Sequence, residues 1–305
     1  MSTAIVITLD FELRWGLLDV LGTDADRYRT NLEGVRDAVP LLLDAFAARR
    51  VGATWATVGA LACEGWDEWG ERAPPPPRYD DPVLRWRDEL RAIDPSGRLH
   101  FAKDLVDLVA RTPGQELGSH TFGHVYVREP GFTRDDAISD TEAMVRLFRD
   151  RWNTVPRSLV FPRNQTAFQD VLTARGIIAW RDNPQTFYWA ATTSTEQSKA
   201  ARALRLADAF APLGRRAAPV AAQRASYFVR LNLPPSLWRL HVRRIVREAK
   251  QLRPDEALHL WWHPHNLGAT PRASVNRIAA LLDALRDAAP SGTRFVSMGD
   301  AANLT

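Results

Sequence analysis

Short hydrophobic runs alternate along this chain with longer segments of helical periodicity. Runs of about four to eight apolar residues, rich in β-branched and aromatic side chains and bounded by turn formers, predict buried strands. The predicted strands cover residues 3–10, 51–59, 115–120, 157–162, 177–180, 257–262 and 293–298. Apolar residues spaced three and four apart predict helices over residues 31–50, 103–112, 133–152, 165–176, 195–210, 236–252 and 272–288.

The residues that interrupt this pattern support the same division. Pro40 falls inside the first predicted helix and should kink it or mark a start within it. Four prolines at 74–77 exclude regular structure and predict a loop. Thr133 is a suitable N-cap for the helix that follows it, and Gly176 should close another. The alternation of strands and helices favours parallel β-α-β units, and 305 residues suffice for one α/β barrel.

Polar residues with catalytic potential follow several of the predicted strands. Asp10 ends the first strand, His120 ends the third, Arg163 follows the fourth after Pro162, and His263 follows a late one. Active sites of parallel barrels are built at the carboxyl ends of the strands. The recurrence of polar residues at these positions therefore predicts a site at that edge of the sheet.

The sequence "GSHTFGH" places His120 and His124 four residues apart. At this spacing two imidazoles share one face of a helix, and a tight turn can also bring them to one metal ion. No glutamate lies between them, which excludes the metalloprotease pattern HExxH. The alternative is that both histidines only cap or hydrogen-bond the backbone.

Asp10 and Glu12, in "TLDFE", stand two residues apart at the end of an apolar strand. On a strand they point to the same side, whereas Leu9 and Phe11 point to the other. Two buried carboxylates are costly without partners. A solvated strand end would avoid that cost, but with two histidines at the same edge we favour a metal ligand and a general base.

A third motif, "LWWHPHN", carries His263 and His265 after an apolar strand. A histidine can serve as a general acid near neutral pH. Because His263 follows the strand directly, we expect it, rather than His265, to be that acid. Arg163 in "FPRNQ" can orient a carboxylate or bind an anionic substrate.

The composition limits the chemistry further. Cys63 is the single cysteine, which excludes an internal disulfide and a Cys-rich metal cluster, so a metal must use His and carboxylate ligands. The first residues carry no secretion signal and no window is apolar enough to span a membrane, so a cytoplasmic location is expected.

Positive charge is concentrated in one segment. Residues 199–253 carry 13 Lys+Arg against 2 Asp+Glu, a net charge of +11. We expect this segment to bind an anionic group, either phosphates of a substrate or the inner face of a membrane. Within it, residues 234–250 interleave apolar residues with arginines. The alternative is a solvated helix docked on the barrel. No nucleic-acid-binding motif is present, so no nucleic acid is expected.

Together these motifs, with "FVSMGDAANL" near residue 304, resemble the polysaccharide deacetylases of the NodB-homology type, carbohydrate esterase family four. The resemblance spans nearly the whole chain, and "SHTFGH" is its most specific part. It implies a distorted (β/α) barrel of about seven parallel strands, forming one catalytic domain over residues 1–305 with insertions at about 62–102 and 183–253. It also implies metal-dependent hydrolysis of N-acetyl groups on sugars, usually with zinc.

Carried over by position, the resemblance makes His120 and His124 metal ligands and His263 the acid. The commoner family pattern has two adjacent aspartates, whereas here one residue separates Asp10 from Glu12. We take Asp10 as the base and Glu12 as the third ligand, with the reverse assignment as the alternative.

By the same resemblance, Arg163 would hold the base. This chain departs from the family pattern here as well, because Pro162 precedes Arg163. The partner of Arg163 is thereby open, and Asp182 is another candidate for it.

The function expected from these residues is N-deacetylation of a sugar during assembly of a surface polysaccharide. Without a secretion signal, the substrate would be a sugar nucleotide or a lipid-linked sugar. One alternative is hydrolysis of another C–N bond, in a formamide, uronamide or ureide, on the same fold. Another is a non-catalytic binding protein, against which stands the simultaneous presence of all the site residues.

Overall fold

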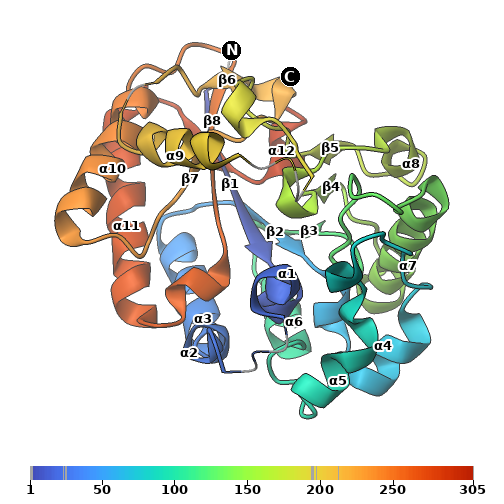
Figure 1. Ribbon diagram of the computed structural model, residues 1–305. Coiled ribbons are helices and arrows are strands. Elements are labelled where there is room, and N and C mark those ends of the chain that lie inside the picture. The colour runs from blue at the N-terminus through green and yellow to red at the C-terminus, as the bar shows by residue number, and fades with distance from the viewer. Residues whose placement is uncertain are drawn as a thin grey trace.

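The computed structural model describes residues 3–22, 24, 26–193, 196, 198–211 and 213–304, without the side chains of 86–88. One mostly parallel sheet lies at its centre (Figure 1). Its strands are β1 (Ala4–Phe11), β2 (Ala53–Thr57), β3 (Gln115–Ser119), β4 (Ser158–Leu159), β5 (Ala179–Trp180), β6 (Ala218–Pro219), β7 (Tyr227–Phe228), β8 (Glu256–Trp262) and β9 (Arg294–Val296).

The strands form a curled half-barrel in the order β5-β4-β3-β2-β1-β8-β6, with β7 also paired to β8 and β9 to β1. All of these pairings are parallel except that of β6 with β8. An isolated bridge between Asp182 and Arg224 links the segment after β5 to the one before β7. The prediction of a distorted α/β barrel is confirmed.

Helices surround this sheet (Figure 1). They are α1 (Leu18–Leu21), α2 (Arg29–Glu33), α3 (Val35–Ala48), α4 (Trp66–Arg72), α5 (Leu90–Ile93), α6 (Lys103–Arg111), α7 (Arg134–Trp152), α8 (Gln169–Thr173), α9 (Lys199–Asp208), α10 (Pro235–Ala249), α11 (Pro271–Ala288) and α12 (Met298–Ala301). Short 3-10 helices follow several strands, among them η1 (Leu13–Leu17), η4 (Pro162–Asn164) and η7 (Pro264–Leu267). None of the described helices is long and apolar enough to cross a bilayer.

The structure differs from the predicted elements in three helices and two short strands. The helix expected over 31–50 divides at Gly34, where a side chain would lie 2.0 Å from the Gly268 carbonyl oxygen, while Pro40 stays inside α3. The helix expected over 165–176 is limited to α8. The helix expected over 195–210 begins at Lys199, and residues 195 and 197 of that prediction lie outside the described residues. Strands β6 and β7 were missed, because two residues each give no periodicity.

The two faces of β1 explain how the site is placed. All eight residues of β1 are buried. Ile5, Ile7, Leu9 and Phe11 belong to the large core packed under the helices, whereas Ala4 and Val6 belong to a small second cluster. Since successive side chains alternate between the faces, the even-numbered residues Thr8, Asp10 and Glu12 continue the face of Ala4 and Val6. The small cluster draws on β1, β2, β5, β8 and β9, so this face looks into the barrel.

Candidate active site

Glu12 lies between the two histidines that follow β3. Its Oε2 atom is 3.1 Å from Nε2 of His120 and 3.1 Å from Nε2 of His124. All three side chains are buried. Burial alone would raise the pKa of Glu12, but the nearby imidazoles of His263, His120 and His124 outweigh it and hold that pKa well below its ordinary value.

A tight turn, not a helix, brings His120 and His124 together. Thr121 and His124 both have positive φ, 63° and 53°, so the chain reverses between them. The Asp140 carboxylate on α7 fixes this turn by accepting hydrogen bonds from the backbone N–H groups of Phe122, at 2.7 Å, and Gly123, at 2.9 Å. Of the two arrangements that the sequence allowed, the structure thus has the turn.

The tautomer of His120 makes this group suitable for a cation. His120 Nδ1 lies 2.7 Å from the Val160 carbonyl oxygen, which can only accept a hydrogen bond. In the neutral ring Nδ1 therefore carries the hydrogen, and the lone pair of Nε2 faces the Glu12 carboxylate. A lone pair facing a carboxylate at 3.1 Å is repulsive unless a cation or a proton lies between them. Two imidazoles and a carboxylate are also a usual ligand set for a divalent metal ion.

Asp10 is held by a different residue from the one predicted. The guanidinium of Arg181 donates to both carboxylate oxygens of Asp10 at 2.7 Å. It also donates to Oγ1 of Thr8 and Oδ1 of Asn164, and it stacks on the Trp261 ring at 4.3 Å. Burial raises the pKa of Asp10, but the charge and hydrogen bonds of Arg181 outweigh it and lower that pKa.

Arg163 does not contact Asp10, and the prediction that it holds the base is wrong. Its guanidinium pairs with Asp19 on α1 and with Glu129, and it lies 4.3 Å from the centre of the Tyr126 ring. The Tyr126 ring in turn packs edge-on against His124. Arg163 therefore supports the wall behind His124.

The alternative partner of Arg163 also lies elsewhere. Asp182 accepts a hydrogen bond from the Asn183 backbone N–H instead. The sequence did carry a signal for Arg181, because this residue directly follows a predicted strand.

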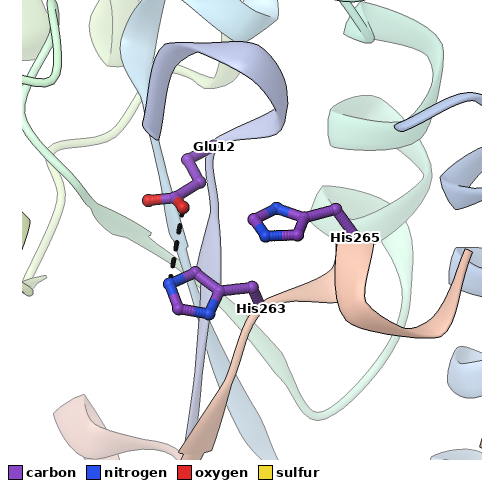
Figure 2. Close-up of side chains that lie close together, drawn as sticks. All are labelled: Glu12, His263 and His265. Atoms are coloured by element: carbon purple, nitrogen blue, oxygen red, sulfur yellow. Dashed lines mark ion pairs between the residues drawn. The ribbon is translucent and has the colours of Figure 1, made fainter. Parts of the chain in front are cut away.

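His263 and His265 approach Glu12 from the end of β8. His263 Nε2 is 3.4 Å from Glu12 Oε1 and 3.9 Å from Asp10 Oδ2, so it lies next to both carboxylates. Figure 2 shows the ion pair with Glu12 and the ring of His265 beside it. The two imidazoles stack with centroids 4.9 Å apart. His263 is partly exposed, whereas His265 is buried, and burial lowers the pKa of His265 to about 3.

Glu12 therefore belongs to two groups that could hold a metal ion. One is Glu12 with His120 and His124, and the other is Glu12 with His263 and His265. In each group the donor atoms lie within 4.8 Å of one another. The first is fully buried and has the fixed tautomer of His120, whereas in the second His263 is open to solvent.

A cleft of about 420 Å³ opens beside these groups. It is lined by Glu12, Gly16, Leu17, Tyr28, Phe228, Arg230, Leu231, Asn232, Leu233, His263, His265 and Asn266. Its volume lies within the usual range of about 300–1,000 Å³ for small-molecule sites. Glu12, His263 and His265 thus border a space of the size that a single sugar needs.

Comparisons with known proteins find relatives of this chain by its fold but not by its sequence. No family model matches the sequence, and no curated protein does. A protein from Mycobacterium smegmatis assigned to the polysaccharide deacetylases superposes with a TM-score of 0.59 at 14% identity, over 99% of this chain and 90% of that one. The fold is that of the NodB-type polysaccharide deacetylases.

Further structures with the deacetylase fold superpose less closely. The chitin deacetylase of the fungal pathogen Colletotrichum lindemuthianum gives a TM-score of 0.47 at 14% identity, over 98% of this chain and 86% of that one. A family-four pseudoenzyme of Bacillus anthracis gives 0.46 at 9% identity, over 99% of this chain and 66% of that one. At such identities the comparisons establish the fold, and the chemistry has to be argued from the site.

The basic segment 199–253 is in part an internal ion-pair network. Arg244 pairs with Glu248 at 2.7 Å and is buried, and Arg216 pairs with Asp208. In α10, Val242, Ile245 and Val246 pack on the large core. These three apolar residues are thus not free for a membrane, as in the alternative of a docked helix, whereas Leu237 and Leu240 near the start of α10 are exposed.

Proposed function

We propose that this chain is a metal-dependent amide hydrolase that removes the N-acetyl group of a sugar. The proposal rests on one observation: the buried imidazoles of His120 and His124 both point their Nε2 atoms at the same oxygen of Glu12. The other carboxylate, Asp10, is paired separately with Arg181. The deacetylase fold adds support, because it brings these groups to the carboxyl ends of the strands. Glu12, His120 and His124 would hold the metal ion, and their donor set suits zinc.

When bound, such an ion would act as a Lewis acid toward the amide carbonyl and a water molecule. Asp10 would take the proton from the attacking water. Its two hydrogen bonds from Arg181 keep it ionised and fix its position, which is what a general base needs. This division makes Asp10 the base and Glu12 the ligand, since Asp10 already has a cationic partner and Glu12 faces the histidines.

His263 would donate the proton that the leaving amine needs when the C–N bond breaks. It is the partly exposed histidine of the cleft, and its Nε2 lies close to both carboxylates. His265 is buried behind it and would support it by stacking. That the substrate is a sugar nucleotide or a lipid-linked sugar of surface-polysaccharide assembly belongs to the same proposal.

The deciding experiment combines metal analysis with product analysis. The purified protein should contain one tightly held divalent ion, and it should release acetate from N-acetylated amino sugars. His120→Ala and His124→Ala together should remove metal and activity, whereas His259→Ala, at a buried histidine outside both groups, should retain the metal. Full metal content in the double variant would refute the ligand set. Release of formate or ammonia instead of acetate would point to another C–N bond.

A further inference from the structure

Arg230 lines the same cleft as Glu12 and His263. Arg230 follows β7. Because β7 pairs with β8, the segment 227–230 lies beside the strand that directly precedes His263. The side chain of Phe228 lies between, packed edge-on against His263 at 5.6 Å and beneath the Arg230 guanidinium at 5.6 Å. Arg230 thus lies one aromatic ring away from the proposed acid.

The guanidinium of Arg230 has no ion pair with any carboxylate that the structure describes. Three other arginines of the basic segment do have such a partner, since Arg215 pairs with Glu256, Arg216 with Asp208 and Arg244 with Glu248. The Arg230 guanidinium lies over the Phe228 ring, and the Arg230 backbone N–H donates to Nε2 of His241. The cleft has one acidic lining residue, Glu12, and that carboxylate already faces His120 and His124.

A half-buried guanidinium without an anion is unfavourable, because its charge has lost part of its hydration without gaining a partner. Burial accordingly lowers the pKa of Arg230. The planar fork of a guanidinium matches the two oxygens of a carboxylate or phosphate and binds them through two parallel hydrogen bonds. The missing partner is thus an oxyanion, and the cleft is the space from which it would come.

We propose that Arg230 selects a substrate whose sugar carries an oxyanion group, a carboxylate or a phosphate, in addition to the acylated nitrogen. This inference rests on the proposed function for the reaction, but it concerns the recognition of the sugar. It places the anion site expected within residues 199–253 at one residue in the cleft.

The test is the binding of deacylated amino sugars, which the proposed reaction cannot consume. Dissociation constants of glucosamine, glucosamine 6-phosphate and glucosaminuronic acid are measured by calorimetry on the metal-loaded protein. The wild type should bind one of the two anionic sugars about 10- to 100-fold more tightly than glucosamine, as expected for hydrogen bonds to a charged group. Which of the two it prefers identifies the phosphate or the carboxylate as the recognised group.

Arg230→Gln should abolish this preference, while the affinity for neutral glucosamine should change little. Arg243→Gln is the matched control, because Arg243 is an exposed arginine of the same segment and does not line the cleft. It should keep the preference. If Arg230→Gln does not fold, Arg230→Lys replaces it and should weaken the preference, because an ammonium group lacks the fork.

A wild type without anion preference would overturn the inference, and so would an unchanged preference in the Arg230 variant. Turnover of the N-acetylated forms of the same three sugars is measured in parallel. Anion-selective binding without any amide hydrolysis would refute the proposed function and leave the role of Arg230 standing. Hydrolysis without anion selectivity would refute the role of Arg230 and leave the proposed function standing.

Discussion

Arg181 and Asp10, 171 residues apart in the chain, form a buried ion pair with two hydrogen bonds of 2.7 Å. Besides the carboxylate, Oγ1 of Thr8 and Oδ1 of Asn164 also accept hydrogen bonds from Arg181. The guanidinium is therefore fixed from several sides, and it fixes Asp10 in turn. The same pair separates the two strand-end carboxylates, because it engages Asp10 and leaves Glu12 to the histidines.

Replacing Arg181 should damage catalysis more than metal binding. Arg181→Lys keeps the charge but loses the second hydrogen bond to Asp10, so we expect kcat to fall by about 10-fold or more with the metal content unchanged. Removing one partner of a buried pair costs about 3–5 kcal/mol, so Arg181→Ala should also lower the melting temperature markedly. Arg163→Lys is the control, because Arg163 does not touch Asp10. Equal losses in both lysine variants would contradict the assignment of Arg181.

Substitutions of Asp10 and Glu12 should have different effects on metal binding and on catalysis. Asp10→Asn should retain the metal and lose a factor of about 10²–10⁴ in kcat, as expected on removal of a general base. Glu12→Gln should weaken metal binding, because its oxygen is the one shared by the two imidazoles. Metal content and single-turnover rates check both. If Asp10→Asn strips the metal and Glu12→Gln keeps it, the roles are reversed.

Gly16 should be needed for metal binding although it is not a ligand. A Cβ atom at this position would lie 2.0 Å from the Glu12 carboxyl carbon. Gly16→Ala must therefore displace the carboxylate, and we expect metal affinity to fall about 10-fold or more, as for other changes that disturb ligand orientation. Gly70→Ala is the control, because open space surrounds that position. Unchanged metal affinity in Gly16→Ala would show that Glu12 is not a ligand.

His263 and His265 should differ in their effects. His263→Gln should lower kcat by about 10²–10⁴ while the metal stays bound, because the proposed ligands are intact. His265→Gln should have the smaller effect on kcat, since its ring only stacks on His263. Loss of metal in the His263 variant would instead place the ion in the group formed by Glu12, His263 and His265.

Acid should unfold the protein partly through Asp94. This carboxylate accepts hydrogen bonds from Ser96, from the Leu99 backbone N–H and from His100. Burial raises its pKa, but these hydrogen bonds outweigh it and lower that pKa to about 2. A lowered folded-state pKa gives stability that is fully present above the unfolded value of 3.8 and is lost as the pH falls toward 2.

Asp94→Asn should therefore destabilise the protein by about 1–2 kcal/mol at neutral pH and flatten the pH dependence of unfolding between pH 4 and 2. Denaturant titrations across this range measure both effects. A wild-type curve as flat as that of the variant would show that the pKa of Asp94 is not lowered.

The sequence predicted the barrel and most of the site for a physical reason. Strand-end residues such as Asp10, Glu12, His120 and His263 can be placed from periodicity alone, because parallel strands share one carboxyl edge. Arg181, the ion-pair partner of Asp10, could not be identified from strand positions. Arg163 and Arg181 both follow predicted strands, and the choice between them depends on where side chains at two neighbouring strand ends reach.

The same limit applies to the basic segment. Its net charge of +11 was visible in the sequence, but the pairing of Arg244 with Glu248 was not. Nor was the position of Arg230, which depends on the two-residue strand β7 and its pairing with β8. Contacts between side chains far apart in sequence decide which charges stay free, and composition does not record them.

The position of β1 in the sheet also affects how the protein is made. This strand lies between β2 and β8 and also pairs with β9, so most of its backbone partners come from residues 256–296. During synthesis one edge of β1 must stay unpaired while more than 200 further residues are made, before β8 exists. Strands that wait in this way are exposed to aggregation. We therefore expect chains that stop before residue 256 to need a chaperone.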